Sequence, residues 1–173
     1  MNKKFFITTL VLCLPLVLTA CQSPSQKMSE KTSEKLAETA IEKSTGGKAN
    51  VDINGNNVSV DTKEGSMQTG ENVSLPADFP SDVYVYEGSI KTAIISNDPK
   101  GYTVSIETDK SLADIKTAYE QKIVADGWEK TGTMDFGETA SVMGKKGNRN
   151  LSVMISKSSD KTAIVLTVVE EKN

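Results

Sequence analysis

This chain of 173 residues contains no histidine and only two cysteines. Without histidine it can form no Ser-His-Asp or Cys-His catalytic unit and no imidazole metal site. It also lacks the imidazole on which a pH switch near neutrality is usually built. Basic side chains are outnumbered, because 20 Lys+Arg face 23 Asp+Glu and the net charge is −3. Duplex nucleic-acid binding needs a clustered basic footprint, so we expect no nucleic-acid partner.

Long apolar runs are scarce as well, and the longest covers residues 5–18, directly after Lys3 and Lys4. It is too short to span a bilayer, which requires about 20 apolar residues. A basic start, a short apolar stretch and small residues at its end are typical of a signal peptide. We therefore expect residues 1–20 to be removed from the mature protein.

The apolar run ends in Leu18-Thr19-Ala20-Cys21, which resembles the lipobox of bacterial lipoproteins. The resemblance implies that the Cys21 sulfur receives a diacylglycerol and that Cys21 becomes the acylated N-terminus, which anchors the protein to a membrane. It further implies a location in the cell envelope, facing away from the cytoplasm. Gln22, in the place where Asp often signals inner-membrane retention, favours the outer membrane if the cell is Gram-negative. An ordinary secreted protein with an incidental cysteine is the alternative.

Cysteine usage agrees with acylation. Cys13 lies inside the apolar run and would be lost on cleavage, which leaves Cys21 as the one cysteine of the mature chain. An intramolecular disulfide is then excluded, and acylation would remove a lone thiol that is a liability in an oxidising compartment.

Apolar residues divide the remaining chain into a sparse part and a dense part. Counting Val, Ile, Leu, Met, Phe, Tyr and Trp gives 9 among residues 22–74 and 31 among residues 75–173. We therefore expect a flexible tether over residues 21–32, a small accessory over residues 33–74, and an α+β domain over residues 75–173, where enough apolar surface exists for a core.

The accessory combines a helix with a β-hairpin. Residues 33–43 are rich in Glu, Lys and Ala, and one helix face collects Leu36, Ala37, Ala40 and Ile41. Asn54-Gly55 lies between alternating apolar residues, which is a strong hairpin signal. Residues 65–67 begin a third short strand. Because a lone hairpin is marginally stable in water, we expect it to pack on the helix or on the next domain.

The C-terminal domain alternates as strands, with one helical interval. Strands are predicted over residues 83–86, 89–96, 102–107, 128–134, 140–145, 151–157 and 162–170. Ser111 can cap a helix that carries one apolar stripe and ends at Gly127. The predicted fold is an antiparallel sheet with one helix packed across a face. Residues 163–169 are nearly all apolar, which predicts a central strand covered on both faces.

Two segments of this domain resemble a module found in many uncharacterised secreted and lipid-anchored bacterial proteins. They read LPADFPSDVYVYEGS and SLADIKTAYEQKIVADGW, and the Gly-rich hairpin before them often accompanies that module. The resemblance spans about residues 45–170. Its motifs are fold residues, so it implies an architecture and no activity. Tyr84 departs from the small residue expected at that position.

Exposed aromatic residues form the first candidate site. Tyr84 and Tyr86 project from one side of a predicted strand, opposite Val83 and Val85. If the valines face the core, the two tyrosines are exposed together and could bind a sugar or a peptide. If the valines are outside, the tyrosines belong to the core. A broader platform would add Tyr102, Trp128 and Phe136, although Trp128 after a helix is typical of a core residue.

Charged clusters form the other candidates, and each also has an ordinary explanation. The acidic residues are Asp78, Asp82, Glu87 and Asp98, and the basic cluster is Lys145, Lys146 and Arg149. Two carboxylates held about 5–10 Å apart in a cleft could act as acid and base. The basic cluster could meet anionic head groups or remain a solvated turn. Asp52-Ile53-Asn54-Gly55 lacks the ligand spacing of an EF-hand calcium loop.

Together these features favour a non-catalytic, lipid-anchored envelope protein that binds an envelope protein or a glycan, or supports an assembly. We expect no cofactor and no metal. The residues assigned to function are Cys21 for acylation and Tyr84 and Tyr86 for ligand contact. A small envelope hydrolase or transferase that uses carboxylates is one alternative, and an inert structural spacer is another.

Overall fold

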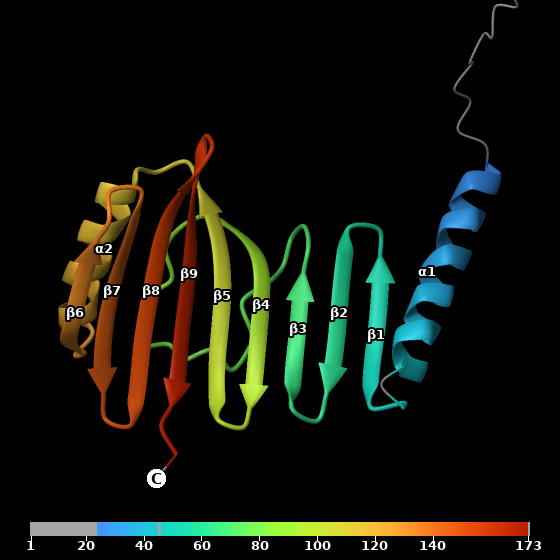
Figure 1. The fold of residues 1–173 in the computed structure, drawn as a ribbon, viewed down its shortest axis with the longest axis horizontal. Coiled ribbons are helices and arrows are strands. Elements are labelled where there is room, and N and C mark those ends of the chain that lie inside the picture. Colours follow the sequence, from blue (N-terminus) through green and yellow to red (C-terminus); the bar gives the residue numbers. More distant parts are fainter. Residues whose placement is uncertain (1–23, 45, 173) are drawn as a thin grey trace, which may run out of the picture.

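A computed structural model describes residues 24–44 and 46–172. The elements, in chain order, are α1 (Pro24–Ser44), β1 (Ala49–Asn54), β2 (Asn57–Thr62), β3 (Gly65–Thr69), β4 (Ser89–Asn97), β5 (Lys100–Thr108), α2 (Leu112–Ala125), β6 (Glu129–Asp135), β7 (Thr139–Lys146), β8 (Arg149–Ser158) and β9 (Lys161–Glu170). The predicted α+β class is confirmed, with one helix, α2, packed on an antiparallel sheet (Figure 1).

All nine strands belong to one sheet, in the order β1-β2-β3-β4-β5-β9-β8-β7-β6. The accessory strands join it through β3, which pairs with β4 in a register that places Gly65 opposite Ser96. A Cβ at Gly65 would collide with the carbonyl of Ile95, so this close pairing requires glycine. The predicted hairpin therefore extends the sheet of the main domain instead of packing on it.

Helix α2 carries the chain from β5, in the middle of the sheet, to β6 at its far edge. Ser111 is the N-cap, and its Oγ accepts the Asp114 N–H at 3.2 Å, as the sequence predicts. The helix buries Ile115, Tyr119 and Ile123 against the sheet. The core beneath it is made mainly by alternate residues of four strands: Tyr102, Val104, Ile106, Val142, Leu151, Val153, Ile155, Ile164, Leu166 and Val168.

Residues 83–86 are not a strand, contrary to the prediction. The segment before them turns twice, because the Phe79 and Val83 N–H groups donate to the carbonyls of Pro76 and Pro80. Prolines favour such turns and restrict the residues that precede them. The segment then runs along α2, where Val83 is buried and Tyr84 contacts a helix residue. Residues 70–88 thus form a strap on the α2 side of the sheet.

Strand β9 is central, as predicted, because it lies between β5 and β8. The prediction that both of its faces are covered is wrong. Ile164, Leu166 and Val168 are buried beneath α2 and the strap, whereas Val165 on the other face is 37% exposed. The apolar run of this strand therefore reflects one core face and one apolar surface.

Helix α1 begins at Pro24 and thus includes most of the segment expected to be a flexible tether. Proline suits the first turn of a helix because the N–H it lacks would have no partner there. Glu34 and Glu38 of this helix accept the N–H groups of Gly55 and Ile53 at 2.8 and 2.7 Å. In Figure 1 the helix lies alongside β1, the first edge strand of the sheet.

The side of α1 that meets the sheet differs from the expected one. The sequence predicts that Leu36 belongs to the packing face, yet this side chain is 67% exposed, while Glu34 and Glu38 are half-buried. The reason is the free backbone of the edge strand, whose unpaired N–H groups require acceptors. Carboxylates on α1 supply them.

We predict that the double substitution Glu34→Ala and Glu38→Ala exposes this edge. Amide hydrogen exchange at Ile53 and Gly55 should accelerate about tenfold, because a hydrogen bond to a charged acceptor is lost at each site. Lys31→Ala with Lys35→Ala, on the exposed part of the same helix, is the matched control and should leave both rates unchanged. Equal exchange in the two double variants would contradict the role of the carboxylates.

Candidate functional site

The acylation site predicted at Cys21, together with the signal peptide, lies outside the described residues. Among the helices that the structure describes, none combines the length and apolarity needed to cross a bilayer. Attachment to a membrane through Cys21 therefore stays a prediction, and the candidate sites below are those of the folded part.

Asp82 of the strap is held by both basic residues of the β7–β8 turn. The Arg149 guanidinium donates from Nη1 and Nη2 to the two carboxylate oxygens at 2.9 and 2.6 Å. Lys146 Nζ donates to the same carboxylate at 2.8 Å and to the Asp126 carbonyl at 2.8 Å. The Arg149 hydrogen bonds, reinforced by Lys146, hold the pKa of Asp82 well below its usual range, although partial burial opposes this. Charge-assisted, bidentate pairs of this kind are stronger than hydrogen bonds between neutral groups.

Trp128 lies beneath these charges. Its indole N–H donates to the Asp82 carbonyl at 2.9 Å, and the Arg149 guanidinium stacks 5.0 Å from the ring centre. Trp128 is almost completely buried, so the prediction of a core residue is confirmed. We call Asp82, Trp128, Lys146 and Arg149 the strap lock, because they join the strap to the far end of α2 and to the β7–β8 hairpin.

The strap lock explains the basic cluster predicted from the sequence. Lys146 and Arg149 both pair with Asp82, and Lys145 donates to Glu171 at 3.0 Å. The cluster is therefore occupied by partners within the chain, and this arrangement favours neither a free anion-binding patch nor a merely solvated turn.

The other candidate carboxylates are scattered. Asp78 accepts the Tyr102 hydroxyl at 2.7 Å, Asp98 pairs with Lys172 at 2.6 Å, and Glu87 is exposed. The four acidic residues thus have separate partners and do not form the facing pair that acid–base cleavage requires. Within residues 24–44 and 46–172, moreover, no three Cys, Asp or Glu side chains gather as a metal site would require.

Tyr84 and Tyr86 are half-buried and meet on α2 instead of standing free. Their ring centres lie 5.4 and 6.3 Å from that of Tyr119, whose hydroxyl accepts the Tyr86 N–H at 3.3 Å. The two rings are nearly perpendicular to each other, at 79°, so they do not present one flat stacking surface. Burial raises the pKa of the Tyr119 phenol, which stays protonated. Ligand contact by Tyr84 and Tyr86 stays a prediction.

The wider aromatic platform does not form. Tyr102 and Trp128 are buried in the core, whereas Phe136 lies in the β6–β7 turn and is 73% exposed. Phe136 thus lies in a different part of the fold from Tyr84 and Tyr86, which belong to the strap.

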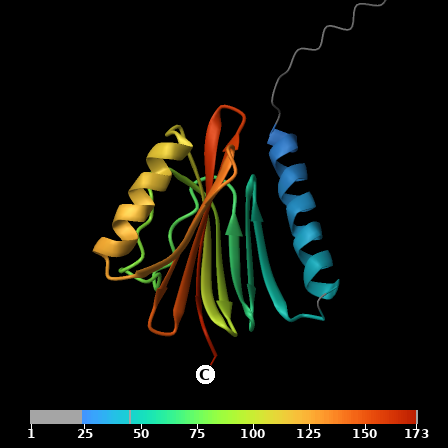
Figure 2. The same cartoon turned by 60° about the vertical axis from the view of Figure 1, so that its left-hand side comes forward.

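A candidate surface that sequence reasoning did not identify lies on the side of the sheet away from α2. Figure 2 shows α2 and α1 on different sides of the molecule with the sheet between them. Over β5, β9, β8, β7 and β6, no helix or further strand of the described residues packs on this side. We call this surface the open face, and the pairing registers place the following residues at its centre: Thr103, Ser105, Val165, Thr167, Ser152, Met154, Ser141 and Met143.

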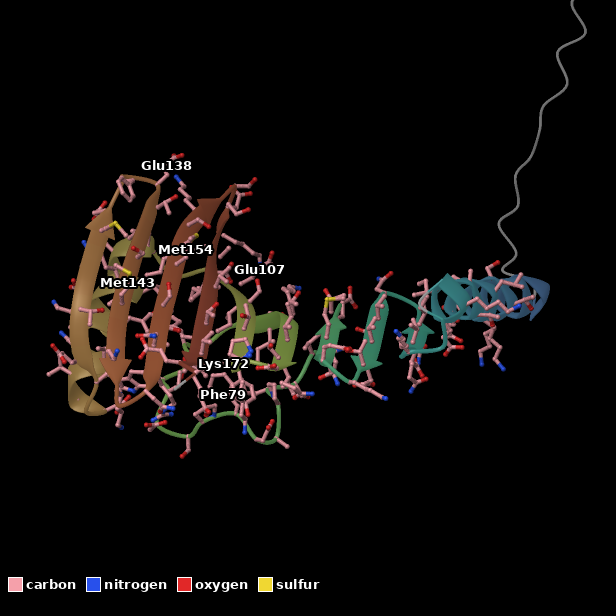
Figure 3. All side chains as sticks on the ribbon, turned by 60° about the horizontal axis from the view of Figure 1, so that its bottom comes forward. Phe79, Glu107, Glu138, Met143, Met154 and Lys172 are labelled. Atoms are coloured by element: carbon pink, nitrogen blue, oxygen red, sulfur yellow. The ribbon has the colours of Figure 1, made fainter. Side chains whose placement is uncertain are left out.

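The open face has an uncharged centre with charges at its margins. Its most exposed apolar side chains are Met154, at 52%, and Met134 of β6, at 44%. Figure 3 shows Met143 and Met154 on the adjacent strands β7 and β8, with Glu107 to one side. Glu107 pairs with Lys91 at 3.7 Å, so this marginal charge already has a partner.

The polar groups at the centre are the small hydroxyls of serine and threonine. The Thr103 and Thr167 hydroxyls lie 3.2 Å apart and hydrogen-bond to each other. Ser141, between Met134 and Met154 in the register, contributes the buried side-chain oxygen that has no partner in the described structure. A shallow hollow of about 290 Å³ lies on this face, and its lining includes Met143, Ser152 and Thr167 of the centre.

One signal in the sequence could have revealed this surface. In strands β7 and β8, buried apolar residues alternate with residues on the other face. The positions on that other face, which are otherwise polar, include Met143 and Met154 among serines. Methionine in the solvent phase of an alternating strand is unusual, because exposed positions are mostly polar.

Comparison with known proteins places the open face largely within a recognised region. A family model described as START domain-like matches residues 89–162, from the beginning of β4 into the first residues of β9. No curated protein and no solved structure matches the chain. Residues 89–162 are thus similar to a START domain-like module, while β1 to β3 and α1 lie outside the match.

We predict that Asp82→Ala lowers the free energy of unfolding by about 1–3 kcal/mol at pH 7, because it removes a bidentate partner and leaves two half-buried cations. Glu87→Ala, an exposed carboxylate of the same strap, is the control and should change it little. Urea denaturation measures both.

The ion pair between Asp82 and Arg149 also predicts that the stability of the fold depends on pH. Since folding lowers the pKa of Asp82, its stabilisation is complete above the pKa of the unfolded state, about 3.9, and is lost as the pH falls further. The difference between the wild type and Asp82→Ala should therefore shrink from about pH 4 toward pH 2. A constant difference over that interval would contradict the lock.

Proposed function

We propose that this chain is a non-catalytic binding module of the cell envelope, anchored through acylated Cys21, and that the open face contacts its ligand or partner. The single observation that carries the proposal is the uncharged, methionine-bearing centre of that face, over strands whose opposite side forms the hydrophobic core. Exposed apolar patches of this kind on soluble domains mark interaction sites.

The composition of the open face is closer to that of a binding interface than to that of an ordinary solvent-exposed surface. Interfaces are depleted of charge at their centre and enriched in methionine, and the charged rim stays in water. Met143 and Met154 carry flexible thioethers, which adapt to the shape of whatever covers them. The match of residues 89–162 to a START domain-like model supports a ligand-binding module and leaves the ligand open.

The two alternatives receive less support. An envelope hydrolase or transferase would need converging carboxylates, but Asp78 and Asp82 are held by separate partners. An inert spacer would have no reason to keep Met154 and Val165 exposed in the middle of a sheet. The proposal of a non-catalytic module rests on these two contrasts.

The anchor would keep the module close to the membrane. Only Gln22 and Ser23 separate Cys21 from Pro24, where α1 begins, and the three Cα–Cα steps between them span at most about 11 Å. We therefore do not propose that a long flexible linker separates the module from the membrane. We expect the partner to lie next to the membrane into which the acyl chains insert.

We predict that Cys21→Ser abolishes incorporation of labelled fatty acid and shifts the protein from the membrane fraction to the soluble fraction. The physical reason is that stable attachment requires the buried acyl chains, each CH₂ contributing about 0.8 kcal/mol. Cys13→Ser, inside the expected signal peptide, is the control and should keep the label. Normal labelling of Cys21→Ser would remove the anchoring proposal.

We also predict that Met154→Lys removes the partner from the open face. In-cell crosslinking followed by mass spectrometry should recover about tenfold less of any crosslinked species, because an unpaired charge at the centre of an interface costs more than 1 kcal/mol. Val124→Lys is the matched control, since Val124 is 61% exposed on α2. Equal recovery from both variants would reject the open face as the binding surface.

A further inference from the structure

We propose that the occupant of the open face is the open face of a second copy of this chain, so that two sheets pack face to face about a two-fold axis. This inference rests on the proposed function, since it names the partner of the same surface. Its support comes from the size of the face, its charge and its pattern of side chains.

The face is large enough for a stable dimer. Five strands spaced about 4.8 Å apart, each contributing about eight residues of about 3.4 Å, give an area near 650 Å² per copy. Two copies would then bury about 1,300 Å² in total, which falls within the range of specific protein–protein interfaces. A small ligand confined to the shallow hollow beside Met143, Ser152 and Thr167 would leave Met154 and Val165 in water.

The charges of the face favour a neutral partner. Its central residues are uncharged, and at its margins Glu107 pairs with Lys91 and Lys145 pairs with Glu171. No net charge is therefore offered to an anionic lipid, a polyanion or a basic peptide. A second copy brings the same neutral centre and the same internally paired rim.

The side-chain pattern can complement itself under two-fold symmetry. Val165 of β9 and Met154 of β8 are direct neighbours in the register, near the middle of the face. An axis that runs between these strands and parallel to them places Val165 of one copy opposite Met154 of the other, and the reverse. The Thr103 and Thr167 hydroxyls hydrogen-bond to each other, so covering the face leaves one of these two O–H donors satisfied within the sheet.

Aligned packing of this kind is ordinary for antiparallel sheets. Two sheets that pack through their inner faces lie about 10 Å apart, with side chains from both interdigitating between them. Helix α2 covers the other side of each sheet, so it would remain on the outside of the pair. Anchoring in one membrane would raise the effective concentration of the two copies.

The test uses the full chain expressed in cells, with one cysteine introduced at a time. Met154→Cys treated with a short bismaleimide should give a covalent dimer, because the two thiols lie across sheets about 10 Å apart. Val124→Cys, on the exposed side of α2, reports random collisions in the membrane and should give several-fold less. The parent chain reports any reaction of Cys21 itself.

A second substitution separates this inference from the proposed function. Val165→Lys added to Met154→Cys should abolish the dimer, whereas Val124→Lys added to Met154→Cys should leave it intact. Equal dimer yields from Met154→Cys and Val124→Cys, or no dimer from Met154→Cys, would overturn the second copy as occupant. If a different crosslinked partner is then still lost in Met154→Lys, the binding function of the open face stands. If no crosslinked partner is lost in Met154→Lys, both the second copy as occupant and the proposed binding function of the open face fail.

Discussion

One helix must cover a sheet that is much wider than the helix. Helix α2 has 14 residues and is therefore about 21 Å long and 10 Å across, whereas nine strands span about 38 Å. The rest of the structure follows from this mismatch. The strap of residues 70–88 extends the cover on the α2 side, α1 shields the edge at β1, and the other face of β5 to β9 remains open.

The strap lock makes the extended cover stable. Residues 70–88 contain no helix or strand, so side-chain contacts hold the strap, among them Val83 in the core and Asp82 between Lys146 and Arg149. The partners of Asp82 are more than 60 positions away in the sequence, which ties the strap to the far hairpin. Binding on the opposite face can therefore occur over a rigid support, since the strands beneath it are fixed by a packed and locked core.

Sequence reasoning recovered most of the fold, because hydrophobic periodicity reports local structure directly. The α2 capping residue, its apolar stripe, the Asn54-Gly55 hairpin and most of the strands are where the pattern placed them. The failures have a common cause, which is competition from distant groups. Residues 83–86 read as a strand but find no pairing partner and lie on α2, and Glu34 and Glu38 face inward because an edge strand offers them N–H groups.

The amino-acid sequence by itself determined the class of fold, the order of its elements and the residues that build the core, since each depends on spacing along the chain. It also supplied the motif that predicts acylation of Cys21. Only the tertiary structure decided which charges are free and which face is exposed. It joined Asp82 to Arg149, it separated Phe136 from the tyrosines, and it left Met154 in solvent. These outcomes depend on strand order and on the reach of a single helix, which no local pattern encodes.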